Sequence, residues 1–421
     1  MLVAAWLGIG LPGVSFAAGT GADVTVHELS GTQHWGSEGD THAYSIGTIA
    51  CSQGTEPVNW CDATNDGCLP DATVTDHPVI GQNLYRLKDG RFEQLGMSWL
   101  KHGFSAIAVA SAGCGDGTCS QSVGERDFLE VGCTDAYSAT RNGFQPLGPR
   151  SAVNPTTGEH PERPSSGGSG IIEERLQVEE GEIDPSLNPS ARYWVEGHYV
   201  SPDDSQDGNA LNNTSHREVI FQPGTLELIL IGTTQRRSSA IAAWQAADPI
   251  VELVPVDLPD HQPAERFHAA RRISGQVGQW HNEYVIHNLN SDRAARAFEI
   301  RFPGAVNISS AGFRDVDHHS GEPYDTTDWA IEIDGAQGLV RWSTDTYDID
   351  QDANALRWGS MFSFWFDADE PLEGVVHTLD LFKPGTPQQV DQVVVPFLDP
   401  AFIFSDEFES GDLSGWSSSM N

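Results

Sequence analysis

Residues 83–95 read NLYRLKDGRFEQL, and this stretch is the clearest indication of the fold. Apolar and polar residues alternate on both sides of Asp89-Gly90. A period of two is typical of a strand with one buried face, and Asp-Gly strongly favours a two-residue hairpin turn. The stretch therefore predicts a β-hairpin. Similar short runs, separated by Gly, Asp and Asn, predict a β-rich domain over residues 22–150.

The second half of the chain shows the same alternation, most plainly in Phe362-Ser-Phe-Trp-Phe-Asp367. We expect strands at 280–288, 297–302, 329–333, 340–343, 361–367 and 375–382. This spacing is typical of an antiparallel β-sandwich, which we place at residues 265–390. A short helix is expected near 238–248, because Ser238 can cap it and Ile241 and Trp244 share one of its faces. The predicted fold is thus mainly β.

The chain of 421 residues is long enough for two domains with hydrophobic cores. The stretch NPTTGEHPERPSSGGSG at 154–170 is rich in Pro, Ser and Gly, which indicates a linker over residues 151–170. We expect residues 171–264 to form a β-rich segment that packs on the first domain. An acidic tail follows at residues 400–421.

The N-terminus indicates export. Residues 1–18 read MLVAAWLGIGLPGVSFAA, an apolar stretch that ends in a small-x-small cleavage pattern at Ser15-Phe16-Ala17. No later segment approaches the ~20 apolar residues that a membrane-spanning helix needs. We therefore predict a signal peptide at 1–18 and no transmembrane anchor.

All six cysteines lie in the first third of the chain, at Cys51, Cys61, Cys68, Cys114, Cys119 and Cys133. An even number of cysteines in an exported protein predicts disulfides, and about 15 pairings remain open. The alternative is a zinc site built around Cys114 and Cys119. The six residues between Cys61 and Cys68 are too wide a spacing for a matching pair of ligands. We therefore expect a disulfide-stapled N-terminal domain.

The charge balance excludes two classes of partner. The chain has 23 basic and 60 acidic residues, a formal net charge of −37. Nucleic acids and anionic membranes are bound through Lys and Arg, which neutralise phosphate. We therefore expect no nucleic-acid partner.

Several segments resemble known exported proteins. The tail FSDEFESGDLSGWSSS at 404–419 resembles a C-terminal F-x-D-G-F-E-S-G-x-x-x-x-W-S segment found on many exported proteins of Gram-negative bacteria, and departs from it at Glu407. The segments 77–104, 147–155 and 315–329 resemble a group of bacterial exported proteins of unassigned function. The resemblance implies export from a bacterium and assigns no catalytic residue.

The richest cluster of ionisable residues is the segment 315–328. Hard cations prefer several oxygen ligands on a flexible loop, and Gly321 and Pro323 indicate such a loop. We therefore predict a Ca²⁺ site, with a plain solvated loop as the alternative. The expected ligands are Asp315, Asp317, Glu322, Asp325 and Asp328.

Catalytic candidates are Lys101 and His102, which lie between aromatic residues in WLKHGF at 99–104, and His318 in the acidic loop. A buried lysine or histidine with a shifted pKa can act as a base or nucleophile. Strand alternation places Lys101 and His102 on opposite faces, so a salt bridge or a core histidine is the competing interpretation. Other histidines, such as His34, His42 and His77, are scattered, and only the fold can bring them together.

These observations predict an exported cell-surface or extracellular protein with a binding or structural role, stabilised by Ca²⁺, with the periplasm as the alternative location. Its partner would be an extracellular glycan or another surface component. The alternative function is an extracellular hydrolase or lyase that acts on polysaccharide, with its site between the two β domains. The sequence indicates neither a specific ligand nor an oligomeric state.

Overall fold

The structure is a computed structural model that describes residues 19–61, 77–144, 147–160, 170–258, 262–385 and 392–395. It is mainly β, and its sheets form two sandwiches, which confirms the predicted fold class. The signal-like segment 1–18, Cys68 and the tail 400–421 lie outside the described residues. The predictions about these parts stay predictions.

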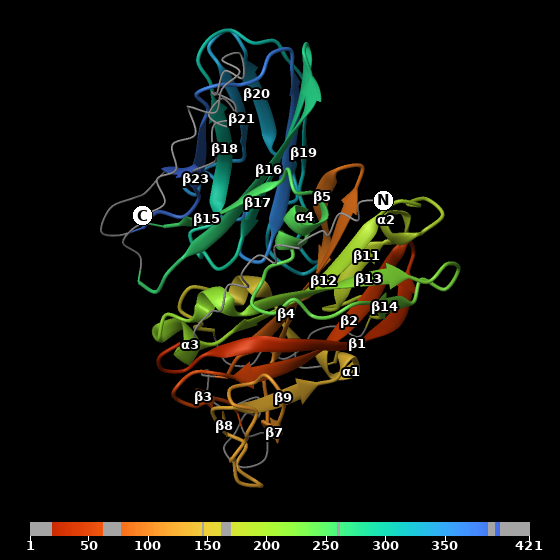
Figure 1. The fold of residues 1–421 in the computed structure, drawn as a ribbon, viewed down its shortest axis with the longest axis vertical. Helices are drawn as coiled ribbons and strands as arrows, with labels where there is room; N and C mark the ends of the chain where they lie inside the picture. The colour runs from red at the N-terminus through yellow and green to blue at the C-terminus, as the bar shows by residue number, and fades with distance from the viewer. Residues whose placement is uncertain are drawn as a thin grey trace, which may run out of the picture.

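The N-terminal sandwich consists of two antiparallel sheets (Figure 1). The first has the order β1-β2-β9-β7, with β11 also paired to β2: β1 (Val24–Glu38), β2 (Thr41–Ser52), β9 (Cys133–Tyr137), β7 (Val109–Ala110) and β11 (Leu176–Glu179). The second has the order β10-β6-β4-β12-β13-β14, with β5 paired to β4: β10 (Leu147–Gly148), β6 (Leu100–His102), β4 (Val79–Lys88), β12 (Arg192–Val200), β13 (Thr214–Phe221), β14 (Leu228–Leu230) and β5 (Arg91–Met97). A small ribbon joins β3 (Val58–Asn59) to β8 (Phe128–Leu129). Tyr44 from the first sheet and Leu84 from the second belong to the core between them.

The hairpin predicted at 83–95 is confirmed as β4 and β5. Lys88 pairs with Arg91 across the turn, and Asp89 and Gly90 have φ angles of 53° and 88°. Positive φ at both central residues is what a type I′ turn requires, and its twist matches that of the strands.

Disulfides crosslink the N-terminal sandwich, as predicted. Cys51 is bonded to Cys114, and Cys119 is bonded to Cys133. Cys61 is also disulfide-bonded. Cys114 and Cys119 therefore have no thiolate to offer a metal, which excludes the zinc alternative at this pair.

The C-terminal sandwich has two antiparallel five-stranded sheets. One has the order β15-β16-β17-β22-β19: β15 (Glu252–Asp257), β16 (Arg266–Gln276), β17 (Gln279–Asn288), β22 (Met361–Ala368) and β19 (Ile308–Arg314). The other has the order β20-β21-β18-β23-β24: β20 (Ala330–Asp334), β21 (Leu339–Ser343), β18 (Ala295–Arg301), β23 (Val376–Leu381) and β24 (Gln392–Val395). Aromatic side chains such as Phe298, Trp342 and Phe364 fill the core. Strands β15, β16, β19 and β24 were not among those predicted from the sequence.

The helices are short. They are α1 (Ala139–Asn142), α2 (Glu180–Ile183), α3 (Pro202–Gln206) and α4 (Ala242–Ala247), with 3-10 turns η1 (Arg150–Ala152) and η2 (Ala210–Asn212). The predicted helix near 238–248 corresponds to α4, but Ile241 rather than Ser238 occupies its N-cap. The backbone N–H of Ser238 instead donates to Thr214 O. Among the described residues, no helix is long and apolar enough to span a bilayer.

A third hydrophobic cluster joins the two sandwiches at α4 and the β4–β5 hairpin. Phe92 of the hairpin stacks near Trp244 of α4, and both pack with Val285 and Met361 of the C-terminal sandwich. Figure 1 shows α4 and β5 at this junction. The hairpin that indicated the fold therefore also connects its two halves.

Candidate metal centre

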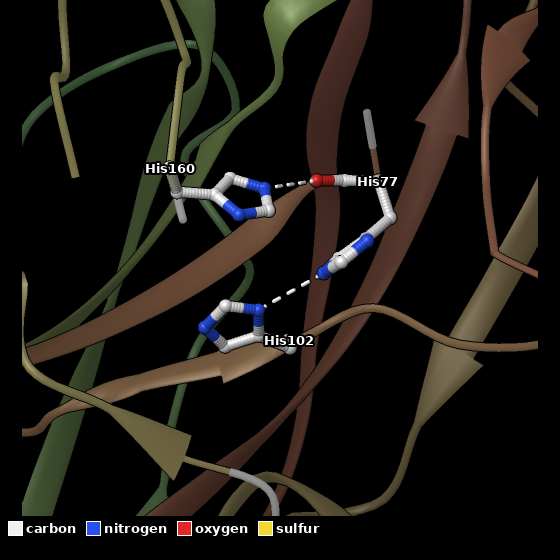
Figure 2. Close-up of side chains that lie close together, drawn as sticks. All are labelled: His77, His102 and His160. Carbon is white, nitrogen blue, oxygen red and sulfur yellow. Dashed lines mark hydrogen bonds between the residues drawn. The ribbon is translucent and has the colours of Figure 1, made fainter. Parts of the chain in front are cut away.

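Three buried histidines converge in the N-terminal sandwich. His77 lies two residues before β4, His102 ends β6, and His160 lies at the end of the loop that follows η1. The side chains are 1%, 2% and 6% exposed. Since Val79 of β4 pairs with His102 of β6, strand pairing itself brings His77 and His102 together. Figure 2 shows the three rings gathered from these separate segments.

The geometry of this cluster is suited to a transition-metal ion. Nε2 of His77 lies 2.9 Å from Nδ1 of His102. One ligand atom from each histidine lies within 4.8 Å of the others, and in the described ranges no other group of three His, Cys, Asp or Glu side chains meets this condition. Zinc–imidazole bonds of about 2.0–2.1 Å place neighbouring nitrogens of a tetrahedral site roughly 3.4 Å apart. The three rings therefore need only small shifts to share one ion.

The hydrogen bonding of His160 orients it as a ligand. Its Nε2 lies 3.0 Å from the carbonyl oxygen of His77 (Figure 2). A carbonyl only accepts, so Nε2 carries the hydrogen and Nδ1 keeps its lone pair. Metal-binding histidines commonly donate their second N–H to a carbonyl or carboxylate, which fixes the ring. The hydrogen bond to the His77 carbonyl oxygen thus holds the His160 ring, and Nδ1 is the nitrogen that would bind the metal.

His160 borders a surface groove. His160 lines an open groove of about 360 Å³ together with Ser151, Val153, Asn154, Glu159 and Asp292. If an ion is bound, this groove is the nearest described space from which a water molecule would reach it as a fourth ligand. A zinc site with three protein ligands keeps such a fourth position for water or substrate.

Lys101 lies beside this cluster but does not belong to it. Its side chain is fully buried, and Nζ donates to the carbonyl oxygen of His102 at 2.6 Å. Nζ also lies 4.0 Å above the centre of the Phe104 ring and 5.2 Å from that of Tyr137. Lys101 and His102 thus contact different groups. The aromatic faces and the carbonyl oxygen stabilise the ammonium, which also interacts electrostatically with Asp135.

The predicted calcium ligands separate into two sets. Asp315, Asp317 and Asp328 interact electrostatically. Burial, together with the like charges of Asp317 and Asp328, raises the pKa of Asp315 to about 6. Burial and Asp328 also raise the pKa of Asp317. A cation beside these three carboxylates would relieve their repulsion, but their ligand atoms do not all lie within 4.8 Å of one another, so the calcium site stays a prediction.

The remaining two carboxylates have other partners. Glu322 accepts hydrogen bonds from the backbone N–H groups of Arg150 at 2.5 Å and Ser151 at 3.2 Å. It therefore ties the C-terminal sandwich to η1. Asp325 accepts from the backbone N–H and the hydroxyl of Thr327, both at 2.6 Å, in a local turn. Among the described residues, the five predicted ligands therefore do not form one close donor group.

His318 lies apart from Lys101 and His102, at the junction of the two sandwiches. It lines a small cavity with Met97, Arg150 and Glu322. Its Nε2 is buried and has no hydrogen-bond partner among the described residues. Burial, with the positive charges of Arg357 and Arg150, lowers the pKa of His318 to about 3. His318 is thus a neutral interface residue at ordinary pH.

Sequence reasoning found one of the three clustered histidines, His102. His77 was noted only as a scattered histidine, and His160 lies inside the segment assigned to a linker. His77 is 25 positions from His102 in the chain, and His160 is 83 positions from His77. No spacing rule covers such separations. The one available signal was that His77 and His102 flank the strongest predicted hairpin.

Comparisons with known proteins add little. No protein-family model matches the chain, and no curated protein does. The N-terminal domain of the adhesin Sgo0707 of Streptococcus gordonii aligns with 85% of this chain at 9% identity and a TM-score of 0.19. The chain spans 62% of that adhesin chain.

A second alignment is with a chain from the structure of manganese lipoxygenase of Gaeumannomyces graminis with partial zonadhesin of Komagataella pastoris. It covers 90% of this chain and 94% of that one, at 8% identity and a TM-score of 0.20. At such low TM-scores, neither likeness carries an argument about fold or function.

Proposed function

We propose that this is an exported cell-surface or extracellular protein with a binding or structural role, whose N-terminal sandwich holds a transition-metal ion on His77, His102 and His160. The disulfides support export, because such bonds persist in oxidising compartments. The observation that carries the metal is the convergence of three buried imidazoles within 4.8 Å. Zinc is the first candidate, since imidazole nitrogen is one of its preferred ligands.

The ion would have a structural role at the junction of the two sandwiches. His160 belongs to the loop 147–160, and this loop also contacts the C-terminal sandwich. Thr156 donates its hydroxyl to Asn290 O at 2.9 Å, and the backbone N–H of Arg150 donates to Glu322. A metal on His160 would hold this loop on β4 and β6. Calcium at Asp315, Asp317 and Asp328 would be a second stabilising ion, and an extracellular glycan the partner.

The metal is tested by elemental analysis and zinc titration of the purified mature protein. We expect one zinc per chain, and loss of that zinc in His102→Ala and His160→Ala. The matched control is His34→Ala, because His34 and His42 form the same type of hydrogen bond at 3.0 Å but belong to no group of three ligands among the described residues. A wild-type chain that binds no Zn²⁺, Cu²⁺ or Ni²⁺, or an unchanged stoichiometry in both cluster variants, would contradict the proposal.

A second candidate function rests on the open groove beside His160. Zinc lowers the pKa of a bound water to about 7, and such a water can act as a nucleophile. An extracellular hydrolase that acts on polysaccharide would use this position. Hydrolysis that disappears with chelation and returns with zinc would support the enzyme. If the protein binds zinc but hydrolyses none of the tested polysaccharides, the hydrolase is rejected and the zinc has only a structural role.

A further inference from the structure

Two buried arginines border one small cavity at the junction of the two sandwiches. Arg150 belongs to η1, which follows β10 of the N-terminal sandwich, and Arg357 lies just before β22 of the C-terminal one. The two residues are 4% and 7% exposed. Both line the cavity, together with His318, Glu322 and Tyr324. Taking a charge out of water is costly, and buried charges in proteins are normally paired with an opposite charge.

Arg150 is well bonded but not neutralised. Its Nε donates to Ser98 O at 2.8 Å, and its Nη2 donates to Gln82 O at 3.0 Å and to Asn83 Oδ1 at 2.9 Å. All of these acceptors are neutral. Within the described ranges, no ion pair includes Arg150. The hydrogen bonds therefore fix the guanidinium in place and leave its positive charge without a contacting carboxylate.

Arg357 has the same lack of a contacting carboxylate and an unused donor as well. Its Nη2 donates to Gln351 O at 2.9 Å and to Ala353 O at 3.0 Å, and its guanidinium lies 3.9 Å from the centre of the Tyr324 ring. Nε of Arg357 is buried and has no hydrogen-bond partner among the described residues. A buried N–H group without an acceptor destabilises a fold. Arg357 thus brings both a positive charge and a free donor to the cavity.

His318 supplies a second free donor. It comes from the loop between β19 and β20, and its buried Nε2 also has no partner in the part of the chain that the structure describes. A neutral imidazole carries its hydrogen on one of its two nitrogens, and with the hydrogen on Nε2 it is a donor. His318 and Arg357 therefore both have N–H groups for a particle that accepts hydrogen bonds.

The carboxylates nearby offset only part of the positive charge. Glu322 is the one carboxylate among the described lining residues, against two guanidinium groups. Its oxygens already accept hydrogen bonds from backbone N–H groups of η1. Asp292 and Asp352 interact electrostatically with Arg357 but form no ion pair with it. The cavity therefore keeps an excess of positive charge.

The size of the cavity selects among anions. Its volume is about 10 Å³, roughly the room that one water-sized particle needs. Sulfate, phosphate and organic anions are too large. Chloride is only slightly larger than a water molecule, and it accepts hydrogen bonds without donating any. A water molecule would also accept from the free donors, but it would not neutralise a buried guanidinium.

We infer that a chloride ion binds in this cavity between Arg150 and Arg357 and accepts hydrogen bonds from Nε of Arg357 and Nε2 of His318. Since Arg150 follows the N-terminal sandwich and the other two belong to the C-terminal one, the ion links the two halves. The net charge of −37 repels chloride at long range, so the affinity depends on these local groups. The inference goes beyond the metal site and does not depend on it.

The test is thermal melting of the full mature chain in sodium chloride and in sodium gluconate at equal ionic strength. Equal ionic strength removes the general screening that stabilises any acidic protein, and gluconate is too large for the cavity. We expect chloride to raise the melting temperature by about 2–4 °C in a saturable way, because it binds the folded state alone. Arg357→Met should abolish this rise, and His318→Phe should shift it to higher chloride concentration.

The matched control is Arg86→Met. Arg86 is also buried, at 6% exposed, but it is paired with Glu93 at 2.7 Å. This variant should melt lower in both salts and keep the response to chloride. A second measurement needs no variant: crystals of the wild type grown in chloride should show anomalous scattering from chlorine in the cavity at long X-ray wavelength. Equal melting temperatures of the wild type in the two salts, an unchanged response in folded Arg357→Met, or density in the cavity without an anomalous signal would overturn the inference.

Discussion

Nε2 of His77 lies 2.9 Å from Nδ1 of His102, although 25 positions separate the two residues in the chain. The antiparallel pairing of β4 with β6 imposes this distance, since it aligns Val79 with His102. Two imidazole nitrogens this close share one proton or one cation. With His160 beside them, a metal ion can replace the shared proton.

Removal of the metal should destabilise the N-terminal sandwich. An ion present at 1,000 times its dissociation constant stabilises the folded state by about 4 kcal/mol. We therefore expect EDTA to lower the melting temperature by several degrees, and zinc to restore it. Because protons compete with metals for imidazole, the effect of EDTA should shrink as the pH falls below about 6. His102→Ala should melt at the same temperature with and without EDTA. A melting temperature of the wild type that EDTA leaves unchanged would contradict a structural ion.

The ion pair between Arg91 and Glu283 should be a major link between the sandwiches. Nη2 of Arg91 lies 2.6 Å from Oε1 of Glu283, whose side chain is 4% exposed, and the guanidinium stacks 3.4 Å from the centre of the Trp365 ring. Breaking a buried pair by removing one partner typically costs about 3–5 kcal/mol. The Arg91 side chain is itself 25% exposed, so we expect Arg91→Ala to lower the free energy of unfolding by less than a fully buried pair would, yet by more than an exposed one.

The control for this change is Arg192→Ala. Arg192 pairs with Glu218 at 2.9 Å, but their side chains are 48% and 30% exposed. Exposed pairs contribute about 0–1 kcal/mol. Urea denaturation should therefore separate the two variants clearly, and equal losses of stability would show that the Arg91 pair does not join the sandwiches.

Acid should destabilise the junction through its buried histidines. Burial, together with the positive charge of Arg150, lowers the pKa of His287 to about 3. Neither ring nitrogen of His287 has a hydrogen-bond partner within the ranges that the structure describes. The unfolded chain takes up a proton below pH ~6.5 whereas the folded one does not, so stability falls as the pH drops from about 6.5 toward 3.

The slope for one such histidine is at most about 1.4 kcal/mol per pH unit. His287→Phe removes this titration and should flatten the stability profile between pH 6.5 and 4, as measured by denaturation at several pH values. His281→Gln is the comparison, because hydrogen bonds to Glu283 and Asp367 raise the pKa of His281 instead. That substitution should lower stability near neutral pH and below. An acid profile of His287→Phe that matches the wild type would contradict this account.

Calcium should act through Asp315 rather than Asp325. Burial and two neighbouring carboxylates raise the pKa of Asp315 to about 6, so its charged form is destabilised at neutral pH without a cation. We expect added Ca²⁺ to raise the melting temperature of the wild type. Asp315→Asn should raise the melting temperature in the absence of Ca²⁺ and abolish the response to it. Asp325→Asn should keep the response, since Asp325 bonds within its own turn. A melting curve that does not respond to Ca²⁺ would remove calcium from the proposed function.

The strand pattern was predictable because it depends on neighbours along the chain. Asp89-Gly90 determines the hairpin turn locally, and alternation in FSFWFD at 362–367 reflects which side of a single strand is buried. The missed strand β19 shows the limit of this reasoning. Its residues Ile308–Arg314 are partly buried or exposed along their whole length, so no alternation marks them.

By itself, the sequence determined the β-rich fold, the hairpin at 83–95 and the presence of disulfides, because strand periodicity, turn chemistry and cysteine content act over short distances or through composition. Only the tertiary structure decided which ionisable side chains meet. Glu322 and Asp315 are close in the chain, yet one binds the Arg150 loop and the other joins two repelling carboxylates. His77, His102 and His160 are far apart in the chain, yet they share one buried space. Strand pairing and interface packing bring together residues of any sequence separation, and no local pattern records that choice.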